Sequence, residues 1–129
     1  MTKRVLVVED NELNLKLFCD LLTAHGFEAH PVRDAREAIT RAQEALPDLI
    51  IMDIQMPHIS GLELIEAVRA DPVLRSTPIM AVTAYAGKGD EDRVREAGAD
   101  AFVSKPITLA RFMQSTEELV SLSDMRLPH

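Results

Sequence analysis

Continuous apolar runs, not alternating ones, mark the strands that the chain predicts most clearly. Residues 5–8, 48–52 and 78–83 each contain such a run, rich in Val, Ile and Met or Leu. A run without polar alternation is typical of a strand buried on both faces, as in a parallel sheet. A weaker strand is predicted at 27–32 and a last, short strand at 101–104.

Between these runs, apolar residues recur at helical spacing, and capping residues mark the ends. Asp34 and Thr108 are suited to helix N-caps, and Gly26 and Gly98 are suited to the positions just after a helix. Helices are predicted at 13–24, 34–44, 61–70, 90–97 and 108 to about 120, with a frayed tail at 121–129.

Strands and helices alternate along the chain, which indicates the α/β class. With right-handed crossovers, five parallel strands give a doubly wound sheet of order 2-1-3-4-5 with helices on both faces. Ligands of such sheets bind outside the carboxyl ends of the strands, where the order reverses between strands 1 and 3. We expect one domain over residues 1–122, a tail at 123–129 and no output domain.

The residues at the carboxyl ends of the predicted strands are carboxylates, a hydroxyl and an ammonium group. Glu9 and Asp10 follow the first strand and Asp53 follows the third, while Thr83 ends the fourth and Lys105 follows the fifth. Several carboxylates in one crevice repel one another unless a cation lies between them. Mg²⁺ prefers such oxygen ligands and often binds a phosphoryl oxygen as well. The set favours Mg²⁺-assisted phosphoryl chemistry with a carboxylate as nucleophile.

Each of these residues also has an ordinary structural interpretation. Asp10 could cap the first helix, Glu9 could be a solvated loop charge, and Thr83 is a common strand residue. Lys105 taken alone is typical of a surface lysine. Asp53 is harder to explain in this way, because the segment after its strand does not continue as a helix. The joint placement at several strand ends is what predicts a site.

Composition excludes several classes of protein. The chain has 129 residues and a formal net charge of −7, whereas a protein that binds nucleic acid through its phosphates needs a basic face. The longest apolar runs, such as residues 5–8, are far shorter than the ~20 residues of a membrane helix. The single cysteine, Cys19, excludes an internal disulfide. The default compartment is therefore the cytoplasm. We also expect a monomer.

Four segments together resemble the receiver domain of response regulators, over Lys3 to about Val120. They are Glu9-Asp10-Asn11, residues 53–61, Thr83-Ala84 and Lys105-Pro106. Within that family, residues 8–14, 82–86, 88–91 and 104–107 resemble single-domain regulators of cell division. The resemblance implies a flavodoxin-like fold, phosphorylation by a histidine kinase, removal of the phosphate by a phosphatase, and signalling through contacts with downstream proteins. It implies neither nucleic-acid binding nor membrane insertion.

The resemblance also implies a role for each site residue. Asp53 would be the phosphoacceptor, and the only chemistry expected is its own phosphorylation and slow dephosphorylation, so the chain is not expected to be an enzyme. The implied Mg²⁺ ligands are Asp10, Asp53, the backbone carbonyl of Gln55 and, through water, Glu9. The residues expected to bind phosphoryl oxygens are Thr83 and Lys105, and Pro106 matches the family's turn after the lysine.

A conformational switch is expected beside this site. Movement of the Thr83 hydroxyl toward a phosphate would vacate space for an aromatic ring, and the residue at the family's position is Phe102. Tyr85 would lie over the phosphorylated carboxylate and shield it from water. The helix at 90–97 has only Val94 and Ala97 as clear apolar anchors, so its local stability should be low.

A docking surface for the kinase is predicted on the first helix. Its apolar residues cover an arc of about 240°, wider than the ~100° needed to face a core. Either some of them are exposed, or the helix is packed more deeply than usual. The predicted docking residues are Asn14, Leu15 and Phe18, together with Pro106 and Ile107.

Three alternatives remain at this point. One is a receiver fragment of a hybrid histidine kinase, which the Met1 start and short tail weigh against. Another is an aspartyl-phosphate phosphatase of the haloacid-dehalogenase type, which typically needs Asp-x-Asp where this chain has Asp53-Ile54-Gln55. A flavodoxin-like electron carrier is the third, and the acidic segment 9–12 would repel its flavin phosphate.

Overall fold

The computed structural model describes residues 2–83, 89–104 and 107–125. Its centre is a parallel sheet in the order β2-β1-β3-β4-β5, which confirms the predicted order. The strands are β1 (Arg4–Val8), β2 (Glu28–Val32), β3 (Leu49–Asp53), β4 (Ile79–Thr83) and β5 (Ala101–Ser104). Every residue of β3 and β4 is buried, as their continuous apolar runs predict.

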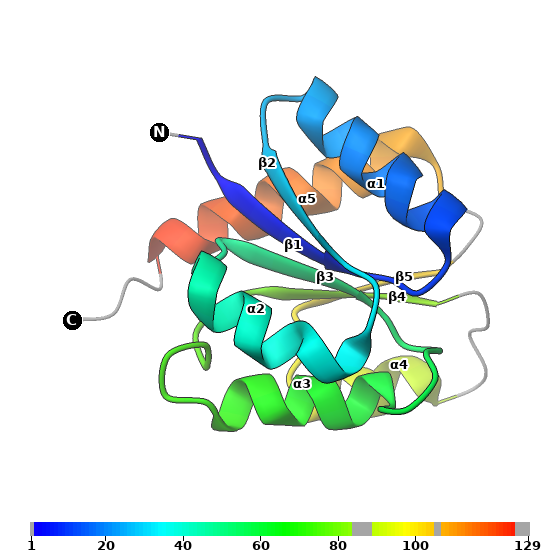
Figure 1. The fold of residues 1–129 in the computed structure, drawn as a ribbon, viewed down its shortest axis with the longest axis vertical. Coiled ribbons are helices and arrows are strands. Elements are labelled where there is room, and N and C mark those ends of the chain that lie inside the picture. Colours follow the sequence, from blue (N-terminus) through cyan, green and yellow to red (C-terminus); the bar gives the residue numbers. More distant parts are fainter. Residues whose placement is uncertain (1, 84–88, 105–106, 126–129) are drawn as a thin grey trace.

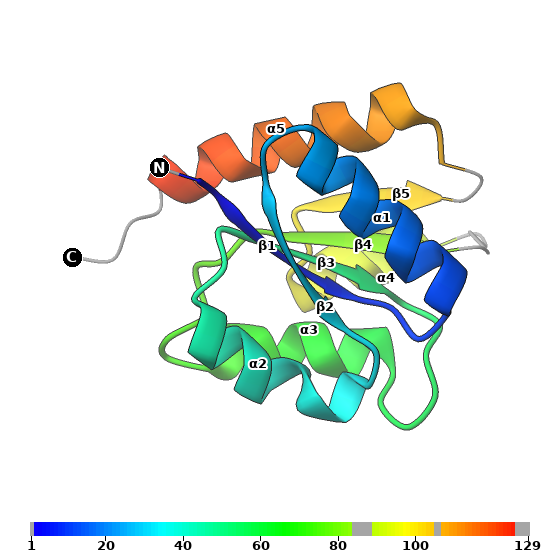
Figure 2. The same ribbon diagram turned by 45° about the horizontal axis from the view of Figure 1, so that its top comes forward.

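Helices cover both faces of this sheet, as Figures 1 and 2 show. They are α1 (Glu12–Ala24), the short 3₁₀ helix η1 (Ala35–Glu37), α2 (Ala38–Ala45), α3 (Gly61–Ala70), α4 (Asp90–Ala97) and α5 (Leu109–Met125). One face is covered by α1 and α5, and the other by α2, α3 and α4. None of the helices within the described ranges combines the length and apolarity that a bilayer crossing requires.

The sheet separates two hydrophobic cores. Along β3, Ile50 and Met52 face the core under α2, α3 and α4, whereas Leu49 and Ile51 face the core under α1 and α5. This alternation follows from the two-residue period of a strand. A strand that is apolar at every position therefore holds both layers of helices and brings its last residue, Asp53, to the edge of the sheet.

Three helix ends differ from the sequence prediction. The N-cap of α1 is Asn11, whose side chain accepts a hydrogen bond from the Asn14 backbone at 3.0 Å, so Asp10 is not the cap. Asp34 is an N-cap as predicted, but of the 3₁₀ helix that precedes α2. The last helix continues to Met125, beyond the predicted end near residue 120. The apolar face of α5 extends through Leu122, which packs on the core and keeps the chain helical.

Candidate functional site

Three carboxylates meet at the carboxyl edge of the sheet. Glu9 follows β1, Asp10 comes next, and Asp53 ends β3; oxygens of the three side chains lie within 4.8 Å of one another. The parallel pairing of Val8 with Met52 sets this meeting, because it brings the ends of β1 and β3 side by side. Glu9 and Asp53 are 1% and 6% exposed, while Asp10 is exposed.

Backbone hydrogen bonds fix the two buried carboxylates. A Glu9 oxygen, Oε1, accepts a hydrogen bond from the Asn11 backbone at 3.2 Å, and the Glu9 backbone N–H donates to Val32 at 3.0 Å. The Asp53 Oδ1 atom accepts a hydrogen bond from the Gln55 backbone at 2.8 Å. Asp53 is therefore oriented by the first residues of the loop that follows it, and sequence reasoning did not assign the N–H groups of Asn11 and Gln55 these roles.

The donor set and its spacing fit a hard divalent cation. Two oxygens bound directly to one Mg²⁺ lie up to about 4 Å apart, because each Mg–O distance is close to 2 Å. A spread of 4.8 Å thus suits an ion that some carboxylates bind directly and another reaches through water, the mixed coordination typical of Mg²⁺ in proteins. A cation here would also offset the repulsion among the three carboxylates.

A cleft opens beside this acidic cluster. It has a volume of about 220 Å³ and lies between the ends of β4 and β5 and the helix α4, where Thr83, Phe102 and Val94 line it. Thr83 is 2% exposed and Phe102 is 8% exposed. The two predicted switch residues, Thr83 and Phe102, therefore both border this cleft. They lie on neighbouring strands, where Thr83 pairs with Ser104 and Phe102 pairs with Ala81. Of the other residues predicted for this region, Lys105, Pro106 and Tyr85 lie outside the described residues.

The docking residues predicted on α1 need a correction. Leu15 and Phe18 are 6% and 4% exposed, so neither presents a surface to a partner. The Phe18 ring instead stacks on Phe112 of α5, with centroids 5.1 Å apart. The exposed leucines of α1 are Leu13 and Leu17, at 80% and 53%. The wide apolar arc correctly indicated exposed residues, but not which ones, because the direction of α5 across α1 was unknown.

Two of the other predicted docking residues lie nearer the surface. Asn14 and Ile107 are each half-buried, and Ile107 packs against the core that α1 and α5 cover. They stay candidates for partner contacts.

Comparisons with known proteins agree with this geometry. The response regulator receiver domain model matches residues 5–117. Two similar proteins are the polar-differentiation response regulators DivK of Brucella ovis and Brucella anthropi, at 52% and 51% identity over 115 residues, 89% of this chain and 94% of each of those proteins.

Solved structures show the same fold. A chemotaxis protein CheY4 from Vibrio cholerae, crystallised at low pH, superposes with a TM-score of 0.87 at 28% identity and covers 92% of this chain and 99% of its own. The receiver domain of a signal transduction histidine kinase from Syntrophus aciditrophicus does so with a TM-score of 0.85 at 31% identity, covering 93% and 91%. With the family model matching most of its length, this chain belongs to the response regulator receiver domain family.

Proposed function

We propose that Asp53 accepts a phosphoryl group from the phosphohistidine of a sensor kinase, and that the phosphorylated chain signals by changing its protein contacts. The observation that carries this proposal is the position of Asp53: buried at the end of β3, with carboxylate oxygens of Glu9 and Asp10 within 4.8 Å. Membership of the receiver family supports it over the phosphatase and electron-carrier alternatives.

The residues around Asp53 have defined tasks in this transfer. An Asp53 oxygen attacks phosphorus, the P–N bond breaks, and the kinase imidazole leaves. The Gln55 N–H, 2.8 Å from Oδ1, holds the carboxylate in one orientation for this attack. The residues that would hold Mg²⁺ are Asp10, Asp53, the Gln55 carbonyl and, through water, Glu9. When bound, the ion supplies charge neutralisation, which is much of what phosphoryl transfer asks of a protein.

The phosphoryl oxygens require further donors. Thr83 and Lys105 are proposed for this role, and Pro106 for the turn that follows the lysine. A phosphoryl group adds close to two negative charges and new acceptor oxygens, so the Thr83 hydroxyl gains a partner. The cleft beside Thr83 and Phe102 gives these side chains room to rearrange. Tyr85 is proposed to shield the acyl phosphate from water.

The biological setting is inferred from relatives of similar sequence. We infer a role in cell-division or cell-cycle control from the similarity to proteins named polar-differentiation response regulators, of which this chain covers 94%. The proposed partners are histidine kinases, phosphatases and downstream signalling proteins. A cytoplasmic monomer that undergoes slow autodephosphorylation, with no other enzymatic activity, fits this role.

The kinase-docking surface is proposed on α1 and the segment before α5. Leu13 and Leu17 replace Leu15 and Phe18 as its apolar contacts, because they are the exposed leucines of α1. Asn14, Pro106 and Ile107 remain its proposed polar and flanking residues. Leu13 lies in the first turn of the helix that begins beside Asp10, on the side of the molecule where the acidic cluster lies.

A phosphorylation assay tests the central proposal. The chain is incubated with acetyl phosphate and Mg²⁺ and its intact mass is recorded. We expect the mass of one phosphoryl group on the wild type, none on Asp53→Asn, and none when EDTA removes the metal. Asp48→Asn is the matched control, since Asp48 stands just before β3, at the opposite end from Asp53. Equal uptake by Asp53→Asn, or none by the wild type, would refute the proposal.

A further inference from the structure

Asn11 lies between the acidic cluster and the first helix, where it is the N-cap of α1. Its side-chain Oδ1 atom accepts a hydrogen bond from the Asn14 N–H at 3.0 Å, and its carbonyl accepts one from the Leu15 N–H at 2.9 Å. The N–H groups of a first helical turn lack acceptors within the helix, so a capping side chain stabilises that turn. These bonds hold Asn11 in an extended conformation, with a φ of −81° and a ψ of 116°.

The backbone N–H of the same residue points the other way, toward the acidic cluster. It donates to Glu9 Oε1 at 3.2 Å, and Glu9 is 1% exposed. A buried carboxylate requires hydrogen-bond donors in place of water. The direction of an N–H group depends on the conformation of its own residue and of the one before it. The cap that fixes Asn11 therefore also fixes a donor to Glu9.

A single residue thus connects the acidic cluster to the first turn of α1. Asp10 stands between Asn11 and Glu9, whose own N–H donates to the Val32 carbonyl at 3.0 Å. Oxygens of Glu9, Asp10 and Asp53 lie within 4.8 Å of one another. Altering a group that orients the ligands of a metal typically changes the metal affinity by about 10- to 100-fold. Fraying of the cap is therefore expected to reach the carboxylates.

We propose that Asn11 is a positioning residue that couples cation binding at the acidic cluster to the order of the first turn of α1. This rests on the proposed function, because the cation is the Mg²⁺ expected at that site. Coupling of this kind is reciprocal, so a cation that favours the observed orientation of Glu9 also favours the cap. Leu13, in the same turn, is exposed and is a proposed docking residue. A kinase bound there and the cation would therefore strengthen each other's binding.

The Mg²⁺ affinity, measured by NMR titration without a phosphodonor, tests this coupling. Asn11→Ala removes the capping oxygen and should weaken Mg²⁺ binding about tenfold, the lower end of the range for groups that orient metal ligands. Asn11→Ser restores a capping oxygen and should bind Mg²⁺ within about twofold of the wild type. Equal affinities in the wild type and Asn11→Ala would overturn the proposal, as would no recovery in Asn11→Ser.

Thr108→Ala is the matched control, because Thr108 caps α5 in the same way. Its Oγ1 atom accepts a hydrogen bond from the Arg111 N–H at 3.3 Å, and its carbonyl accepts one from the Phe112 N–H at 3.0 Å. The variant should lower the urea midpoint of unfolding as Asn11→Ala does, and it should keep the wild-type Mg²⁺ affinity. An equal loss of affinity in Thr108→Ala would contradict a specific role for Asn11.

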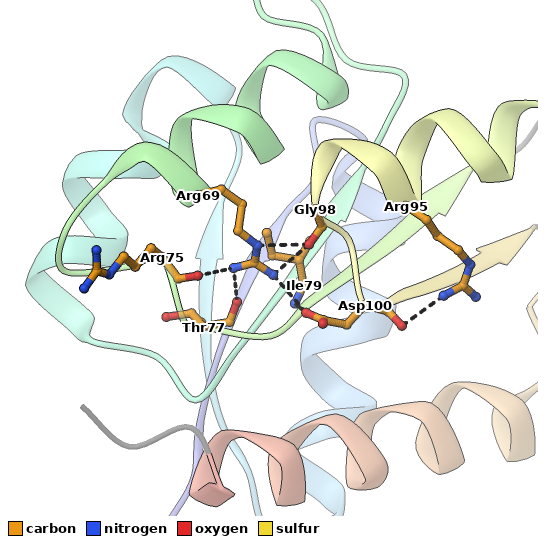
Figure 3. Close-up of polar contacts among 7 residues, drawn as sticks. All are labelled: Arg69, Arg75, Thr77, Ile79, Arg95, Gly98 and Asp100. Atoms are coloured by element: carbon orange, nitrogen blue, oxygen red, sulfur yellow. Dashed lines mark hydrogen bonds and ion pairs between the residues drawn. The ribbon is translucent and has the colours of Figure 1, made fainter. Parts of the chain in front are cut away.

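A second control destabilises the fold at the opposite end of the sheet. Figure 3 shows the Arg69 guanidinium directed at the turn after α4, where its Nε and Nη2 atoms donate to the Gly98 carbonyl at 3.0 and 2.7 Å. Arg69 Nη2 also forms an ion pair with Asp100, just before β5, at 2.9 Å. Arg69→Gln should lower the unfolding midpoint and leave the Mg²⁺ affinity unchanged. If it weakened Mg²⁺ binding as much as Asn11→Ala does, loss of stability alone would explain the effect and the proposal would fail.

Amide hydrogen exchange tests the reverse direction of the coupling. In the wild type, saturating Mg²⁺ should slow exchange of the Asn14 and Leu15 amides severalfold, because both acceptors belong to Asn11. In Asn11→Ala these amides should respond much less, and those of Arg111 and Phe112 at the start of α5 should not respond in either protein. An unchanged rate at Asn14 and Leu15 in the wild type would overturn the proposal, since a residue with only a structural role would not transmit cation binding.

The proposed function and the coupling through Asn11 can fail separately. Acetyl phosphate is added to the same samples after the titration, and the intact mass reports phosphorylation of Asp53. A wild type that binds Mg²⁺ but gains no phosphoryl group would refute the proposed function, while the measured affinities still decide the role of Asn11. A wild type that binds no Mg²⁺ would overturn the coupling.

Discussion

Gly61, the first residue of α3, touches the backbone of Ile54, the residue that follows Asp53. A Cβ atom at Gly61 would lie 2.6 Å from the Ile54 Cα atom, and the Gly61 N–H donates to the Ile54 carbonyl at 3.1 Å. This contact closes the base of the loop that carries Gln55, whose N–H orients the Asp53 carboxylate. The geometry of the proposed phosphorylation site therefore depends on the absence of a side chain seven residues after Ile54.

Replacing Gly61 by alanine should harm both stability and phosphorylation. Alanine is favoured over glycine in a helix by up to about 1 kcal/mol, but crowding a packed contact costs about 1 to 3 kcal/mol. Because the crowded neighbour includes the Ile54 backbone, it cannot move away easily. The cost of crowding should therefore exceed the gain in helix propensity. We expect Gly61→Ala to lower the free energy of unfolding and slow phosphoryl uptake from acetyl phosphate.

Gly26→Ala is the control for this substitution. Unlike Gly61, Gly26 has a left-handed φ of 88°, and nothing lies within 4 Å of a Cβ placed there. The Gly26→Ala variant should lose about 1 kcal/mol of unfolding free energy through its backbone conformation alone. It should take up phosphate at the wild-type rate. A Gly61→Ala variant more stable than the wild type would show that the Ile54 contact relaxes easily.

Removing one carboxylate from the acidic cluster should stabilise the metal-free chain. Asp10 lies within 4.8 Å of two other carboxylates, and repulsion in a partly solvated site costs about 1 kcal/mol or more. Asp10→Asn should therefore unfold at higher temperature than the wild type in EDTA. Because binding to the native state stabilises it by mass action, Mg²⁺ should raise the melting temperature of the wild type and raise that of Asp10→Asn much less.

Glu66→Gln makes the same change of charge on the exposed surface of α3, away from the cluster. It should leave the Mg²⁺-dependent rise in melting temperature unaltered. An equal rise in Asp10→Asn and the wild type would exclude Asp10 as a ligand.

The sequence was sufficient to predict which residues meet at the carboxyl edge of the sheet, but not which residues of α1 are exposed. Asp53 could be placed because a strand that is apolar at every position must be buried, and parallel strands present their last residues along one edge. No such rule distinguishes Phe18 from Leu17. Both belong to one broad apolar arc, and only the position of Phe112 on α5 decides that Phe18 is covered. The length of α5 was missed for a related reason, since its final apolar turn packs on a core built from distant segments.

The exposed leucines on α1 should affect the rate of phosphoryl transfer from a kinase but not the rate from a small phosphodonor. Burying a leucine side chain contributes about 1.5 to 3 kcal/mol, so losing the Leu17 contact should slow transfer about tenfold or more. We expect Leu17→Ser to show this loss with a phosphorylated histidine kinase that transfers to the wild type, and an unchanged rate with acetyl phosphate. Val73→Ser, at a position that is 58% exposed after α3, should leave both rates unchanged. An equal loss with both donors would point to damage at the site itself.

The N-cap of η1 should contribute a pH-dependent part of the stability. The Arg36 side chain, and after it the Arg36 backbone N–H, hold the pKa of Asp34 at about 2, below its ordinary value of 3.8. A folded-state pKa below the unfolded one means that the contribution is present above pH 3.8 and disappears as the pH falls toward 2. The difference in unfolding free energy between the wild type and Asp34→Asn should shrink over that interval. Arg36→Gln should raise the pKa of Asp34 measured by carboxyl NMR, and an unchanged pKa would reject this cause.

The stacked pair Phe18 and Phe112 should couple α1 to α5. Both rings are buried and their planes are 11° apart, and aromatic pairs contribute about 0.5 to 1.5 kcal/mol beyond the area that they bury. In a double-mutant cycle with Phe18→Leu and Phe112→Leu, we expect an interaction energy in that range. Denaturant unfolding of the wild type, both single variants and the double variant measures it.

A second cycle shows whether this coupling belongs to the contact. The control cycle combines Phe18→Leu with Ile65→Val, because these two residues lie in the separate cores on either face of the sheet. Substitutions at distant sites change the unfolding free energy additively within about 0.5 kcal/mol, so this cycle should show no larger interaction energy. Phosphotransfer from the kinase distinguishes packing from docking, because a buried Phe18 has no surface to offer a partner. The folded Phe18→Leu variant should therefore accept the phosphoryl group from the kinase at the wild-type rate. A slower transfer from the kinase, with an unchanged rate from acetyl phosphate, would show that Phe18 is a docking residue after all.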